Sequence, residues 1–206
     1  ETALRFPSAL AGTFAVLLVY RLGLDLLGRR AGLMAGLIAA VNPFLVYYAQ
    51  ETRSYSYLLC LTLLATVLLL RQLRRHNDYR PWGWLPYILV MTAALWSHYF
   101  ALFAVVLHWA IVALLWPWRW RPVALWLAVQ AVVGVLFAPW LLVSFAVLTS
   151  YKTVGRGEVP AEMLRQTITA IVHGAAWDMR LPSATAGFFG CLMVGGLVAA
   201  RLFRPG

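Results

Sequence analysis

The stretch AGLMAGLIAAVNPFLVYYAQETRSYSYLLCLTLL, residues 31–64, sets two apolar runs on either side of a short charged turn. Each run approaches the ~20 residues that a helix needs to cross a bilayer. The turn carries Glu51 and Arg53, whose charges are costly inside lipid. Because backbone groups in lipid must be hydrogen-bonded within their own segment, we predict two membrane helices joined at a membrane surface.

The same pattern repeats along the whole 206-residue chain, which is 63% hydrophobic and 12% charged, with a mean hydropathy of +0.77. Such values exclude an ordinary water-soluble domain. We therefore predict one all-α membrane domain over residues 1–206, with about seven spans of the length that a bilayer requires. The predicted spans are 7–27, 31–49, 54–70, 82–97, 99–116, 122–143 and 184–203.

Residues 144–183 separate the last two predicted spans and form the longest non-spanning segment. Within it we predict an amphipathic helix near 160–173, since Pro160 and Glu162 suit a first turn and Gly174 a stop. One stripe of this helix is apolar, which is typical of a helix lying on a membrane surface. The stripe consists of Met163, Leu164, Ile168, Ile171 and Val172.

The arginines orient the spans. They concentrate in residues 21–30, 71–80, 119–121 and 201–204, where the only acids are Asp25 and Asp78. The positive-inside rule places this side in the cytoplasm, so residues 50–53 and 144–183 are expected outside. The net charge of +10 is then topogenic, and the basic, aromatic stretch at 116–122 is a membrane anchor. We expect no nucleic-acid partner and an integral protein of a bacterial inner (plasma) membrane.

Three local features are also expected. Asn42-Pro43 should kink its helix, because proline removes a backbone donor. Arg21 and Asp25, four positions apart, can pair. A face of small side chains before the kink permits close helix packing. This face consists of Ala31, Gly32, Ala35, Gly36, Ala39 and Ala40.

The outer turns hold the residues suited to chemistry. On a helix, Glu51 and Arg53 would point in different directions, so each is expected to need another partner. For Arg53, a phosphate gripped by two hydrogen bonds is one partner, and simple snorkelling to headgroups is the alternative. Inside the spans His108 is the one ionisable side chain near mid-helix, which weakens the case for a proton-coupled transporter.

Four segments, 4–23, 28–64, 96–109 and 138–143, resemble the membrane glycosyltransferases related to protein O-mannosyltransferases and the lipid A aminoarabinose transferase. The resemblance covers about 1–145. It implies a GT-C-like membrane domain that transfers a sugar, with inversion, from a polyprenyl-phosphate donor. The acceptor would be a protein, lipid or glycan on the outer side. The resemblance implies no nucleotide cofactor and leaves a divalent metal open.

The resemblance rests on three motifs. A QEAR-x-Y signature matches residues 50–55, with Thr52 in place of alanine, and a THYF turn matches residues 97–100, with Ser97 in place of threonine. An LRxPSA motif matches residues 4–9. By resemblance, Arg53 and Arg5 would bind the donor phosphate.

The remaining motif residues would order the site or line the donor pocket: Glu51, Tyr55, His98 and Tyr99. Glu51 and His98 are also the candidate metal contacts. For Tyr55 and Tyr99 a role in the interfacial aromatic belt is an equal alternative.

The catalytic residue of these enzymes is an aspartate in the first outer loop, which by resemblance would lie before Glu1. We therefore expect no catalytic residue within 1–206 and expect this fragment by itself to be inactive. Two other classes stay open: a transporter or lipid flippase that recognises a phosphate headgroup, and a structural subunit.

Overall fold

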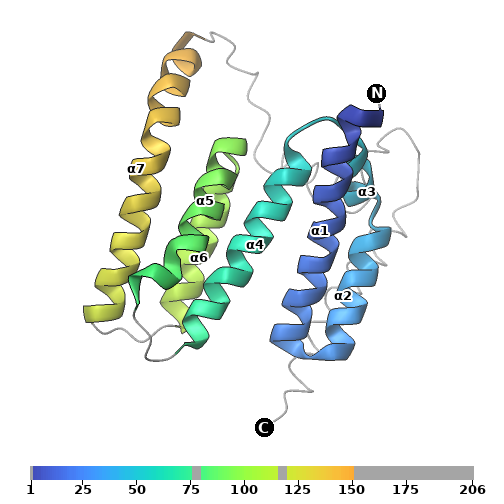
Figure 1. Cartoon of the computed structure of the whole chain (residues 1–206), viewed down its shortest axis with the longest axis horizontal. Helices are drawn as coiled ribbons and strands as arrows, with labels where there is room; N and C mark the ends of the chain where they lie inside the picture. Colours follow the sequence, from blue (N-terminus) through green and yellow to red (C-terminus); the bar gives the residue numbers. More distant parts are fainter. Residues whose placement is uncertain (1, 76–79, 116–119, 151–206) are drawn as a thin grey trace, which may run out of the picture. The chain divides into compact units, whose positions relative to one another are not determined.

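The structure, a computed structural model, describes residues 2–75, 80–115 and 120–150 (Figure 1). Every regular element in these ranges is a helix, which confirms the all-α prediction. The described residues fall into two compact units, the first ending at Arg53 and the second beginning at Ser54. In chain order the elements are α1 (Thr2–Leu27), α2 (Arg29–Val41), α3 (Pro43–Gln50), α4 (Tyr55–Arg74), the 3₁₀ helix η1 (Pro81–Trp84), α5 (Leu85–Ser97), α6 (Ala101–Leu115) and α7 (Trp120–Ser150).

Three helices in the described ranges are long and apolar enough to cross a membrane: Ala3–Leu27 in α1, Tyr55–Arg74 in α4 and Trp120–Val143 in α7. The α2–α3 pair passes the same test as one broken span. Within the predicted spans 82–97 and 99–116 the structure has the helices α5 and α6, which with 13 and 15 residues are shorter than the three long helices, so these two spans stay predictions. The predicted span 184–203 and the amphipathic helix at 160–173 lie outside the described residues.

The first unit is built on close contact between α1 and α2, which lie side by side in Figure 1. Gly28 makes the turn between them with a φ of +90°, a conformation that favours glycine. A Cβ on Gly32 would lie 2.8 Å from the backbone nitrogen of Leu24, and one on Gly36 would lie 3.0 Å from the Cβ of Tyr20. Gly32, Gly36 and Ala39 of the predicted small-residue face are buried, and the two glycines pack against α1, whereas Ala40 is exposed.

The predicted kink at Asn42-Pro43 is confirmed, and it is a complete break. Asn42 is extended, with φ −68° and ψ 119°, and its Oδ1 accepts a hydrogen bond of 3.1 Å from the backbone N–H of Leu45. This caps α3, and Pro43 takes the first helical position, where its missing N–H costs nothing. The helices on either side differ in direction by 56°. The bend lets α3 pack against α1, where a Cβ on Gly12 would lie 2.7 Å from that of Ala49.

In the second unit, α4 packs against α5 and α6, and α5 also packs against α7. Aromatic side chains fill its centre: the rings of Trp84 and Trp126 are 5.7 Å apart, and those of Tyr87 and Trp126 are 5.8 Å apart. All three are buried. These rings explain how helices with little polar surface pack in a specific way, since aromatic pairs prefer particular geometries.

Two further sequence predictions, one ion pair and one helix end, can be compared with the structure. The pair of Arg21 and Asp25 is confirmed, with Nε and Oδ2 3.0 Å apart. In contrast, α7 does not end at residue 143, where the outer loop was predicted to begin, but continues to Ser150. The reason is visible in the sequence, because no proline or glycine follows residue 143 until Gly155.

Candidate functional site

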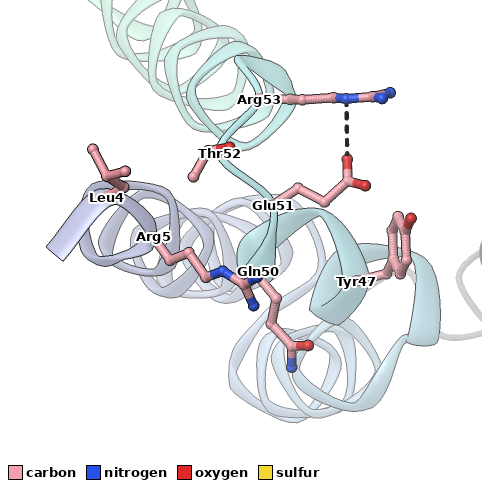
Figure 2. A pocket seen from close by; sticks show the side chains of 7 residues that line it. All are labelled: Leu4, Arg5, Tyr47, Gln50, Glu51, Thr52 and Arg53. Atoms are coloured by element: carbon pink, nitrogen blue, oxygen red, sulfur yellow. Dashed lines mark ion pairs between the residues drawn. The ribbon is translucent and has the colours of Figure 1, made fainter. Parts of the chain in front are cut away.

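The first unit carries a hollow of about 470 Å³ at the place where α1 begins and α3 ends (Figure 2). The first turns of α1 contribute two of its residues, and the end of α3 with the segment after it contributes the rest. It is lined by Leu4, Arg5, Tyr47, Gln50, Glu51, Thr52 and Arg53. Two guanidinium groups and one carboxylate thus border a single hollow.

Glu51 and Arg53 form an ion pair, with Oε2 and Nε 3.7 Å apart (Figure 2). The expectation that these residues would point away from one another is wrong. It assumed a helix, but α3 ends at Gln50 and Glu51 is extended, with φ −87° and ψ 151°. Residues 51–53 form a bend after the helix, and there the two charges can meet.

The contact between these two side chains is weak. A separation of 3.7 Å is beyond hydrogen-bond distance, and the side chain of Arg53 is 68% exposed. Exposed pairs of this kind contribute about 0–1 kcal/mol to stability. The charge of Arg53 is therefore held near Glu51 without being locked to it.

The carboxylate of Glu51 is more enclosed, because its side chain is only 24% exposed. Its Oε2 atom is buried and has no hydrogen-bond partner among the described residues. Tyr47, one helical turn earlier, lines the same hollow. Figure 2 shows the Tyr47 and Arg53 side chains on either side of the carboxylate. The hollow therefore holds an enclosed carboxylate beside an exposed cation.

Arg5 reaches the same hollow from α1, and in Figure 2 its side chain runs toward Gln50. The contact of α1 with α3 at Gly12 and Ala49 holds these two helices at close range. The structure thus brings together three residues that the sequence singled out: Arg5, Glu51 and Arg53.

Tyr47 is a site residue that the sequence interpretation missed. A signal was present, because Tyr47 lies three and four positions before Gln50 and Glu51. On a helix this spacing places side chains on one face. Gln50 had been noted only as part of a motif, and Thr52 only as a departure from it; both line the hollow.

The other three candidates lie in the second unit: Tyr55 begins α4, and His98 and Tyr99 lie in the turn between α5 and α6. His98 ends α5 in extended backbone, and its Nδ1 accepts a hydrogen bond of 3.2 Å from the backbone N–H of Phe100. Its ring centre lies 4.5 Å from that of Tyr99 and 5.4 Å from that of Tyr55. The turn therefore presents a cluster of rings in which the Nδ1 edge of His98 is turned toward the backbone of the turn.

The two candidate metal contacts, Glu51 and His98, belong to different units. Within the described part of the chain there is no group of three or more His, Cys, Asp or Glu side chains placed to hold a metal ion. Metal binding stays a prediction for these two residues.

Comparison with protein families identifies the family to which the chain belongs. Residues 1–143 match the model of the family described as dolichyl-phosphate-mannose-protein mannosyltransferase. Neither a search of curated proteins nor one of solved structures found a match. The matched range includes every helix through α6, the charged residues Glu51 and Arg53 and the ring cluster at His98. The chain is thus an integral membrane protein that belongs to the dolichyl-phosphate-mannose-protein mannosyltransferase family, of the GT-C type.

Proposed function

We propose that this protein transfers a sugar from a polyprenyl-phosphate-linked donor to an acceptor on the outer face of the membrane, with inversion at the sugar carbon. One observation carries the proposal: Arg5, Arg53 and Glu51 border a single hollow at helix ends in an apolar protein. The family supports it, since its description names a phosphate-linked mannose donor and a protein acceptor.

In this proposal the hollow binds the donor phosphate. A guanidinium fits a phosphate through two parallel, charge-assisted hydrogen bonds. Because Arg53 is mostly exposed and its contact with Glu51 is longer than a hydrogen bond, a phosphate can recruit it at little cost. Arg5 supplies a second positive charge from α1. Both stabilise the charge that grows on the phosphate as the sugar leaves.

Glu51 is proposed to order the site, since its carboxylate lies between Tyr47 and Arg53. The rings of Tyr55, His98 and Tyr99 are proposed to line the donor pocket, where aromatic faces suit sugar and isoprenoid groups. A divalent metal, for which Glu51 and His98 are the candidate contacts, and the absence of a nucleotide cofactor are also part of the proposal.

The proposed orientation follows the charge distribution. Residues 71–80 face the cytoplasm of a bacterial cell, and 50–53 and 144–183 face outward, because the arginine-rich segments remain inside. The hollow would then open to the leaflet in which an extracytoplasmic donor presents its phosphate.

The test uses the full-length protein in membranes, with polyprenyl-phosphate mannose as donor. Arg53→Lys keeps the charge but offers no planar fork, so we expect donor affinity to fall by about tenfold or more, equivalent to ~1.4 kcal/mol. The matched control is Arg21→Lys, whose parent side chain pairs with Asp25 within α1. Full donor affinity in Arg53→Lys would overturn the phosphate assignment.

A further inference from the structure

A chain of hydrogen bonds crosses the centre of the second unit. None of its residues belongs to the ring cluster around His98. It centres on His108 of α6, which is 0% exposed. His108 Nδ1 lies 3.1 Å from the hydroxyl of Tyr87, and its Nε2 lies 3.0 Å from the hydroxyl of Thr66. Gln130 Nε2 lies 3.2 Å from the same Tyr87 oxygen. These side chains come from α4, α5, α6 and α7, one from each helix.

The direction of this chain follows from counting protons, beginning at Thr66. Its hydroxyl lies 2.8 Å from the backbone carbonyl oxygen of Thr62, which can only accept. A hydroxyl has one proton, so Thr66 donates that proton to Thr62 and must accept in its contact with His108. The Nε2 atom of His108 therefore carries a proton.

The remaining links are then determined. Complete burial disfavours a charged His108, and a neutral imidazole has one N–H, so the Nδ1 of His108 is an acceptor. The Tyr87 hydroxyl donates to it, and the Tyr87 oxygen accepts from the amide N–H of Gln130. Each link in the sequence Gln130, Tyr87, His108, Thr66, Thr62 joins one donor to one acceptor, and no link requires a charge.

We propose that this one-way chain is a polar clasp that holds α4, α5, α6 and α7 in register, with His108 neutral and protonated on Nε2. Apolar helices in lipid have little hydrophobic reason to prefer one register, and hydrogen bonds between helices supply one. A buried network with every member satisfied favours a single packing arrangement. A shift of any helix would leave buried donors or acceptors without partners, each at considerable cost.

The clasp also assigns a structural role to His108, which could otherwise be interpreted as a proton-transfer residue. A histidine in mid-membrane is by default a candidate for proton transfer. Here both ring nitrogens are engaged, and the chain ends at the Thr62 carbonyl, which has no proton to pass on. The geometry describes a structural group, and it removes the strongest intramembrane residue from the transporter alternative.

The protonation state can be measured directly. We would record nitrogen NMR spectra of the full-length protein in lipid nanodiscs at neutral pH, with ¹⁵N in the histidine rings, and assign His108 by difference from a His108→Gln sample. The expected spectrum shows one protonated nitrogen, Nε2, and one bare nitrogen, Nδ1. A proton on Nδ1, or a charged ring, would overturn the proposal.

The clasp predicts a difference between two identical substitutions. Thr66→Val removes the acceptor of His108 Nε2, whereas Thr92→Val removes a buried hydroxyl on α5 that has no hydrogen-bond partner among the described residues. We expect Thr66→Val to lower the melting temperature by a few degrees and Thr92→Val to leave it unchanged or raise it. Equal effects of the two would contradict the clasp. If Thr66→Val did not fold, the NMR measurement on the unmodified protein would still decide.

Discussion

The hollow of the first unit and the clasp of the second both place polar groups in a largely apolar protein, and they hold them differently. In the hollow, the charged groups of Glu51 and Arg53 are 3.7 Å apart and Arg53 is 68% exposed. In the clasp, the three contacts around His108 and Tyr87 are 3.2 Å or shorter, and both residues are 0% exposed. Loosely paired surface charge is available to a ligand, whereas a satisfied buried network serves packing. The difference separates a candidate binding site from a structural element by geometry alone.

The largest expected effect tests whether α1 and α2 are closely packed in the first unit, although the contact between Glu51 and Arg53 is weak. Gly32→Val would force a Cβ to within 2.8 Å of the Leu24 backbone, so α1 and α2 would have to separate. Overpacking of this kind costs about 1–3 kcal/mol, measured as the free energy of unfolding in mixed micelles. The matched control is Gly134→Val in α7, where a Cβ would meet nothing within 4 Å. Equal stability of the two variants would show that α1 and α2 are not closely packed at Gly32.

An intermediate effect is expected at the break that positions the hollow. Asn42→Ala removes the Oδ1 acceptor that caps α3, which should cost about 1 kcal/mol of stability. Asn42→Ser is the control, because serine can cap the same N–H and should retain most of that stability. Since α3 carries Tyr47 and Gln50, donor affinity should weaken in Asn42→Ala and recover in Asn42→Ser. A loss of affinity that serine did not restore would argue against the cap as its cause.

Much of the helix arrangement in the first unit could be predicted from the sequence, because it depends on local patterns. The break at Asn42-Pro43, the pairing of Arg21 with Asp25 and the small face around Gly32 are properties of neighbouring residues or of one helical turn. The two charged residues between apolar runs likewise led us to predict Arg53 as a candidate binding residue.

The parts that the sequence interpretation missed depend on the end of a helix or on several helices at once. The pairing of Glu51 with Arg53 was mispredicted because the pattern could not show that α3 stops at Gln50. The clasp was not foreseen because His108 finds its partners on two other helices, and Tyr87 finds Gln130 on a third, at positions that no short-range spacing connects. Single polar residues in apolar runs are thus visible in a sequence, and their partners are not.

The smallest expected effect is the most direct test of the comparison between hollow and clasp. Glu51→Gln removes one charge of the pair while keeping nearly the same shape. If the pair is as weak as its distance and exposure indicate, stability should change by less than about 1 kcal/mol. A double-mutant cycle with Arg53→Gln, measured by unfolding in mixed micelles, would isolate the coupling between the two side chains. A coupling of several kcal/mol would mean that the pair is a structural bridge. Arg53 would then have to break it before binding a phosphate, and the hollow would belong with the clasp as part of the packing.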